Sequence, residues 1–195
     1  KNSLIKIKKN YNFAEIRNLI DKFKNLKVLV LGEAIIDQYV FCDALGKSGK
    51  EPVLALREMK SETYLGGALA ITRHISKFCD KTNLLTMLGE KKEFLKDIKK
   101  NFEKNINFDF IQKKNSPTIF KKRFVDHVSN NKVLGVYNIN DDPLNDNDEN
   151  ILNKKLKKIL HKYDIVIVSD YGHGFISEKT AKIICSSSRF VALNA

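Results

Sequence analysis

Short, unbroken apolar runs recur along the chain, separated by segments in which apolar residues lie three or four positions apart. Apolar runs of this length are typical of strands that are buried on both faces of a parallel sheet. The spaced apolar stripes between them predict amphipathic helices. The expected strands cover residues 28–32, 83–89, 107–112, 164–170 and 189–193, and the expected helices cover 13–25, 64–78, 92–102, 148–163 and 177–186. This alternation predicts an α/β fold with a parallel central sheet.

Two regions depart from the alternation of strand and helix. Residues 38–64 hold several short extended runs, and residues 118–138 hold two β-rich runs on either side of the polar turn 129–131. The second pattern is a strong signal for a β-hairpin. We therefore expect these regions to form a small accessory sheet.

Two features near the first apolar run could bind a ligand. In open α/β sheets ligands bind outside the carboxyl ends of the strands. Asp37 follows the strand that ends at Gly32, and its carboxylate could accept hydrogen bonds from ligand hydroxyls. Gly66 and Gly67 lie at the start of the expected helix 64–78, where backbone N–H groups could face a ligand. The pattern leaves open that Asp37 is a surface acid and that the glycines only form a tight turn.

The strand at 164–170 repeats the same theme. It ends in Asp170 and is followed by Tyr171-Gly172-His173-Gly174. Polar loops flanked by glycine at strand ends often carry function. Asp170 and His173 are therefore candidate site residues, with a purely structural loop as the alternative.

Composition and charge narrow the function classes. The 195 residues carry a net charge of +12, with 43% hydrophobic and 30% charged residues. The lysines are scattered and no basic motif with interleaved aromatic residues occurs, so nucleic-acid binding is not expected, whereas an anionic small molecule suits the positive field. The three cysteines lack metal-site spacing, which favours reduced thiols in a cytoplasmic protein. No apolar run reaches the ~20 residues needed to span a membrane.

Four motifs in register resemble the PfkB, or ribokinase-like, carbohydrate kinases, and most closely the kinase domain of bifunctional heptose-phosphate kinase/ADP-heptose synthases. The motifs are the strand before Asp37, the Gly66-Gly67 turn, the hairpin from Thr118, and Ser169-Asp170-Tyr171-Gly172-His173-Gly174. The resemblance implies a three-layer αβα fold with a small β-sheet lid, which often makes homodimer contacts. It also implies phosphoryl transfer to a hydroxyl of a sugar or sugar phosphate, with ATP and Mg²⁺ as cofactors of the full-length protein.

The resemblance assigns expected roles to individual residues. Asp37 matches the acid that binds sugar hydroxyls, and Gly66 and Gly67 match a sugar-contacting turn. Arg123 matches a basic lid residue whose planar fork suits a substrate phosphate. Asp170 and His173 fall on the loop that borders the substrate.

Three positions depart from the family pattern. Ala70 stands where the family has an asparagine, His173 where the heptose kinases have a lysine, and Glu33 where the first aspartate is usual. These changes leave the identity of the sugar open. They also motivate an alternative function. The chain could be a non-catalytic, kinase-like module, fused to a nucleotidyltransferase, that either binds a sugar or sugar nucleotide or has a regulatory role.

The same resemblance predicts how the chain is divided. Residues 1–25 are expected to form a linker and helix from a preceding segment. Residues 26–195 are expected to be the N-terminal part of a PfkB-type kinase domain, with lid strands at about 38–64 and 118–138. The catalytic GAGD-type motif and most of the ATP site are expected beyond Ala195, so this part alone is expected to be inactive.

Overall fold

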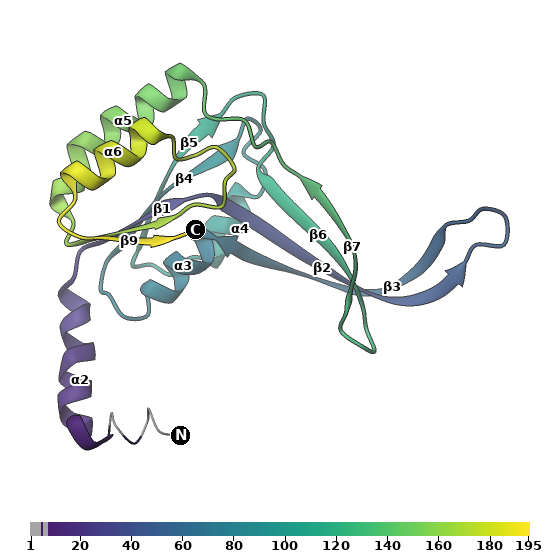
Figure 1. The fold of residues 1–195 in the computed structure, drawn as a ribbon, viewed down its shortest axis with the longest axis horizontal. Coiled ribbons are helices and arrows are strands. Elements are labelled where there is room, and N and C mark those ends of the chain that lie inside the picture. The colour runs from purple at the N-terminus through teal and green to yellow at the C-terminus, as the bar shows by residue number, and fades with distance from the viewer. Residues whose placement is uncertain (1–4, 6–7) are drawn as a thin grey trace.

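The computed structural model describes residue 5 and residues 8–195. The linker that the sequence predicts at the start of the chain falls partly on residues 1–4 and 6–7, which lie outside the described residues. In the described part the chain forms two sheets with helices packed on one of them (Figure 1).

The central sheet is parallel throughout, with the strand order β5-β4-β1-β8-β9. Its strands are β1 (Val28–Gly32), β4 (Thr82–Gly89), β5 (Ile106–Lys113), β8 (Ile165–Ser169) and β9 (Val191–Asn194). Strand β1 is buried along its whole length, as its unbroken apolar run predicts. The predicted α/β class with a parallel central sheet is confirmed.

Helices cover both faces of the central sheet (Figure 1). On one face lie α5 (Asp146–Ile159) and α6 (Glu178–Ser187), and on the other lie α3 (Ala68–Ile75) and α4 (Leu95–Asn101). The side chains of β1 alternate between two apolar clusters because successive residues of a strand point to opposite faces. Leu29 packs in the cluster that contains Leu152 of α5, and Val30 packs in the cluster that contains Leu69 of α3.

The second sheet has four strands in the order β3-β2-β6-β7 and extends away from the helices (Figure 1). Its strands are β2 (Ala34–Lys47), β3 (Leu54–Gly67), β6 (Ile119–Asp126) and β7 (Lys132–Asn138). Strands β6 and β7 form the predicted antiparallel hairpin. The expectation of several short strands between 38 and 64 is wrong: β2 and β3 are two strands of 14 residues each, joined as one long hairpin.

The two sheets are joined by very short connections. Glu33 alone separates β1 from β2, and β3 ends at Gly67, immediately before α3 begins at Ala68. The carboxyl end of β1 and the start of the second sheet are therefore fixed relative to each other by one residue.

Polar side chains cap several helices. Ser177 accepts a hydrogen bond from the Thr180 N–H at 3.1 Å at the start of α6. Helix α2 (Phe13–Lys22) begins with a capping box formed by Asn12 and Glu15, and the 3₁₀ turn Phe23–Asn25 follows it. Helix α2 has no buried residue, so its predicted apolar stripe is not packed against the rest of the described chain. A second 3₁₀ turn, Leu160–Lys162, follows α5.

Candidate functional site

One face of the second sheet gathers the polar side chains that the sequence singles out. Strands β2 and β6 are parallel, with Asp37 opposite Lys121 and Tyr39 opposite Arg123. Residues in register, and residues two apart along a strand, present their side chains to the same face. Tyr137 of β7 lies opposite Lys121 and on the same face. We call this surface the site face.

Asp37 and Arg123 form an ion pair on the site face. Their side chains are only 20% and 17% exposed, respectively. Burial opposes the charge of Arg123, but the hydrogen bond and the negative charge of Asp37 outweigh it and raise the pKa of the guanidinium. The Arg123 guanidinium also lies over the rings of Tyr39 and Tyr137, 5.6 and 5.5 Å from their centroids. The structure thus brings together two residues that are 86 positions apart.

Gly66 lies directly beside this pair. A Cβ at this position would come within 2.2 Å of Asp37 Oδ2. The missing side chain is therefore what leaves room for the carboxylate.

Gly67 has a different neighbour. Its φ of +56° is unfavourable for other residues, and a Cβ there would lie 2.5 Å from the carbonyl oxygen of Glu33. That same carbonyl accepts the N–H of Ala68 at 2.9 Å. The first N–H of helix α3 is thus bonded within the chain, and the expectation that it faces a ligand is wrong for this group.

Gly32 ends β1 beside the neighbouring strand β8. A Cβ at Gly32 would meet the carbonyl oxygen of Ser169 at 2.0 Å. The glycine is therefore required where β1 and β8 approach each other at their carboxyl ends.

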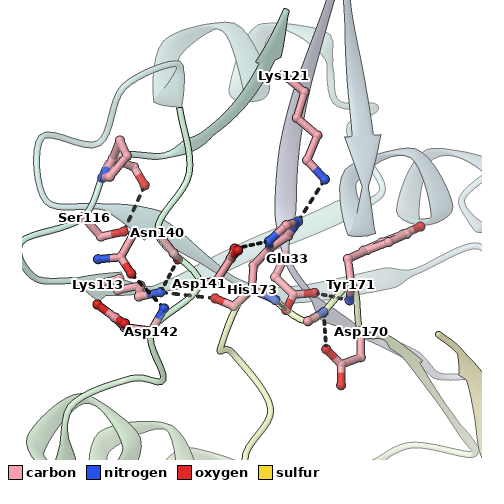
Figure 2. Close-up of polar contacts among 12 residues, drawn as sticks. Glu33, Lys113, Ser116, Lys121, Asn140, Asp141, Asp142, Asp170, Tyr171 and His173 are labelled. Carbon is pink, nitrogen blue, oxygen red and sulfur yellow. Dashed lines mark hydrogen bonds and ion pairs between the residues drawn. The ribbon is translucent and has the colours of Figure 1, made fainter. Parts of the chain in front are cut away.

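Glu33 connects these strand ends to the loop after β8. The residue is fully buried, and its carboxylate accepts the N–H groups of Tyr171 at 3.0 Å and His173 at 3.2 Å (Figure 2). Burial raises the pKa of Glu33 above its ordinary value, and the charge of Asp170 adds to this, while the two N–H groups act in the opposite direction. In the sequence, Glu33 stands out only as a departure from the family pattern. An acid inside an apolar run was the available signal that it has a buried role.

His173 is bonded through its ring and through its backbone (Figure 2). Nδ1 lies 2.6 Å from Asp141 Oδ1, and Nε2 lies 2.9 Å from Lys121 Nζ. The backbone carbonyl accepts from Lys113 Nζ at 3.1 Å, and Lys113 also donates to the carbonyl of Asn140 at 2.7 Å. Burial lowers the pKa of Lys113. Lys113, Lys121 and Asp141 are distant in sequence and carry no motif, so sequence reasoning missed them.

Asp170 occupies the edge of this loop. Its carboxylate accepts the Gly172 N–H at 3.0 Å, and its own N–H donates to the carbonyl of Asn194 in β9. The hydrogen bonds of Asp170 therefore stay within the loop and the sheet edge.

The candidate residues form two groups, Asp37 with Arg123 and Gly66, and Glu33 with Asp170 and His173. Lys121 joins them, because it lies in register with Asp37 and touches His173.

A cavity of about 350 Å³ lies beside the long hairpin of β2 and β3, on the side of this hairpin that faces away from the site face. It is lined by Ile36 and Leu65 of the hairpin, by Arg73 of α3 and by Phe94 and Asp97 near α4. None of the sequence-predicted site residues line it, so the polar site face and this cavity are separate features.

Within the described residues, no group of three or more His, Cys, Asp or Glu side chains is placed to hold a metal ion. Of the three free thiols, Cys42 and Cys79 are buried and Cys185 is exposed. No helix in the described part of the chain is both long and apolar enough to cross a bilayer.

The fold defines a class: it is a ribokinase-like α/β fold, of the kind found in solved sugar kinases. Escherichia coli phosphofructokinase-2, solved in complex with fructose-6-phosphate, matches 87% of this chain and 55% of its own, with a TM-score of 0.63 and 17% identity. Arabidopsis thaliana ribokinase, solved with ribose and ATP, matches 88% of this chain and 54% of its own, with a TM-score of 0.57 and 18% identity.

The particular relatives by sequence are bifunctional proteins named HldE. The protein from Histophilus somni is 31% identical over 158 residues, which is 80% of this chain and 32% of the relative. The protein from Campylobacter jejuni is 26% identical over 168 residues, covering 86% of this chain and 34% of the relative. No protein-family model matches the chain. The chain thus spans about a third of the length of these curated relatives, and the predicted resemblance to the PfkB kinases is confirmed.

Proposed function

We propose that this chain is the substrate-binding part of an ATP-dependent sugar or sugar-phosphate kinase that resembles the kinase domain of HldE. The complete protein would transfer a phosphoryl group to a sugar hydroxyl, with ATP and Mg²⁺ bound largely outside the described residues. Such a reaction depends on positioning and on stabilising the charge of the transferred group, so the placement of the sugar is central to it.

The observation that carries the proposal is the half-buried pair of Asp37 and Arg123. A carboxylate can accept hydrogen bonds from two sugar hydroxyls, and a guanidinium can bind a phosphate through two parallel N–H groups. Gly66 leaves open the space against the carboxylate. In this proposal Gly67, Asp170 and His173 shape the border of the substrate site.

The test is an Asp37→Asn variant, compared with Asp43→Asn. Asp43 lies six residues beyond Asp37 on the same strand, is similarly shielded at 23% exposure, and pairs with Arg57 and His127 rather than with Arg123. A panel of heptose phosphates and fructose 6-phosphate is titrated against each protein by calorimetry, and ATP consumption is followed with any sugar that binds. We expect Asp37→Asn to weaken binding by about 10- to 100-fold, the range for losing a charged hydrogen bond, and Asp43→Asn to bind as the wild type does.

Two results would count against the proposal. Equal weakening in both variants would place the effect in general stability rather than at a sugar site. Failure of every sugar phosphate to bind the wild-type protein would remove the main support for a kinase.

A second candidate function is a kinase-like module that binds a sugar or sugar nucleotide without phosphorylating it. Ala70 favours it, because an asparagine that would contact the sugar is replaced, and so does His173, whose two ring nitrogens are already engaged. Sugar binding that depends on Asp37 without ATP consumption by the complete protein would favour this function over the kinase.

The proposal extends to location and assembly. A cytoplasmic protein suits three free thiols. A homodimer through the second sheet suits strand β7, where Leu134, Val136 and Tyr137 are about half exposed. For comparison, E. coli phosphofructokinase-2 has been solved in a tetrameric inhibited form.

A further inference from the structure

Lys121 differs from Arg123, its neighbour on the site face. Arg123 is paired with Asp37, whereas Lys121 forms no ion pair with a carboxylate anywhere in the described part of the chain. Its ammonium group lies 5.9 Å from the centroid of Tyr137, and the guanidinium of Arg123 lies 5.5 Å from the same centroid. Two cations thus gather around one ring, and only Lys121 keeps its charge uncompensated by an acid.

The contact with His173 defines the state of the imidazole. A lysine ammonium can only donate, so Nε2 of His173 must accept from Lys121 at 2.9 Å. The ring is then neutral, with its proton on Nδ1, and donates to Asp141 at 2.6 Å. The hydrogen-bonded chain therefore runs from Lys121 through His173 to Asp141, and it has a single consistent arrangement of protons.

The loop holds the imidazole rigidly in this arrangement. The side chain of His173 is 9% exposed, its N–H is bonded to Glu33, and its carbonyl is bonded to Lys113. A Cβ at Gly174, whose φ is +82°, would lie 2.1 Å from the carbonyl of Asp142, so the loop is pressed against the 139–145 segment. The ring of His173 has little freedom to leave either partner.

We propose that His173 is a positioning residue, whose neutral imidazole, oriented by Asp141, holds the Lys121 ammonium on the site face as an anion-binding group. One N–H of the ammonium is used by His173, and the other two are free to donate to the oxygens of a dianionic group such as a phosphate ester. The inference rests on the proposed sugar-phosphate site and adds a determinant of its anion affinity.

Protonation of His173 would break the arrangement. Nε2 would become a donor facing the Lys121 ammonium, and the two positive groups would repel each other. The positive charge gained by the ring would by itself favour an anion, but Asp141 lies against Nδ1 and would compensate that charge. The displacement of the Lys121 ammonium is therefore the larger effect, and it weakens anion binding. The charged groups facing His173 from the packed elements are Glu33, Lys113, Lys121, Asp141 and Asp142, with Asp170 on its own loop.

Inorganic sulfate is the probe, because it stays a dianion over the range in which histidines titrate, about pH 5 to 8. Its affinity is measured by calorimetry for the wild type, Lys121→Met and Lys122→Met. Lys122 is the adjacent, half-buried lysine on the opposite face of β6. We expect Lys121→Met to weaken sulfate binding about tenfold and Lys122→Met to leave it unchanged.

Two variants of His173 separate positioning from packing. The amide of His173→Gln ends near the place of Nε2 and can accept from Lys121, whereas the shorter amide of His173→Asn ends near Nδ1 and reaches only Asp141. We expect His173→Gln to keep sulfate affinity and to lose its decline at acidic pH, and His173→Asn to bind as weakly as Lys121→Met. Thermal melts check that both variants are folded.

Three results would overturn the inference: sulfate affinity of the wild type that does not fall on acidification, equal behaviour of the two His173 variants, or no sulfate binding to the wild type. The outcome is separable from the kinase proposal. If the sulfate results are as expected but no sugar is phosphorylated, the proposed function fails and the inference stands. If Asp37→Asn abolishes sugar binding while His173→Asn behaves as the wild type, the inference fails and the proposed function stands.

Discussion

Glu33 is a buried acid whose charge affects folding stability. Because its pKa is raised above the ordinary 4.5 in the folded state, the folded protein binds this proton more tightly than the unfolded chain does. The stabilisation from proton binding is complete below the unfolded pKa and is lost as pH rises through the folded pKa. The wild type should therefore lose stability from this group as pH increases above about 4.5, by about 1.4 kcal/mol for each unit of difference.

The prediction is tested with Glu33→Gln. Urea unfolding from acidic to neutral pH should show the wild type declining relative to this variant, which has no proton to lose. At acidic pH the variant should also be less stable than the wild type by about 1–3 kcal/mol. In the wild type both carboxyl oxygens of Glu33 accept a backbone N–H, whereas in the variant one of these N–H groups would face the amide NH₂, which cannot accept it. Glu178→Gln, at an exposed site, is the control. Parallel curves for wild type and Glu33→Gln would contradict the raised pKa.

Single residues at the site could be predicted from the sequence only where a strand end or a turn marked them. Asp37 follows an apolar strand, and Gly66 begins a helix signal, so both could be named as candidate site residues from the sequence. Lys121 was not found, because its role depends on strand β6 lying in register with β2, and on a loop 52 residues later. Local patterns contain no information about such pairings.

The start of helix α3 depends on the conformation of Gly67. Gly67→Ala would force a side chain into a backbone with φ of +56° and against the carbonyl of Glu33. We expect it to lower the free energy of unfolding by about 1–3 kcal/mol in chemical denaturation. Gly49→Ala is the matched control, because a Cβ there meets nothing within 4 Å, and it should change stability by about 0.5 kcal/mol or less. Equal effects would mean that the chain relaxes around Gly67 without cost.

Elements of the central sheet could be predicted closely, and those of the second sheet less so. Strands buried on both faces read as unbroken apolar runs, so β1, β4 and β8 were located within a residue or two. Strands β2 and β3 are half exposed and contain polar residues, and both carry register shifts in their pairing. Such interruptions made two long strands look like several short ones.

At the scale of the whole molecule, stability should be concentrated in the helices packed on the central sheet. Leu152 of α5 is fully buried, whereas Leu19 of α2 is 49% exposed. Leu152→Ala should cost about 2–5 kcal/mol of unfolding free energy, because it leaves a cavity. Leu19→Ala should cost about 0.5 kcal/mol or less. A comparable loss from both would show that α2 packs against a surface in solution.

The short connections between the two sheets have a consequence for how this architecture tolerates change in its length. A single added residue beside Glu33 would shift β2 by one position and reverse the faces of Asp37 and its neighbours, because strand faces alternate. The tips of the hairpins, at 48–53 and 127–131, have no such constraint. Homologous chains should therefore vary in length at these tips but keep a constant number of residues from Gly32 to Asp37. That constant number would preserve the distance between the group around Glu33 and the group around Asp37.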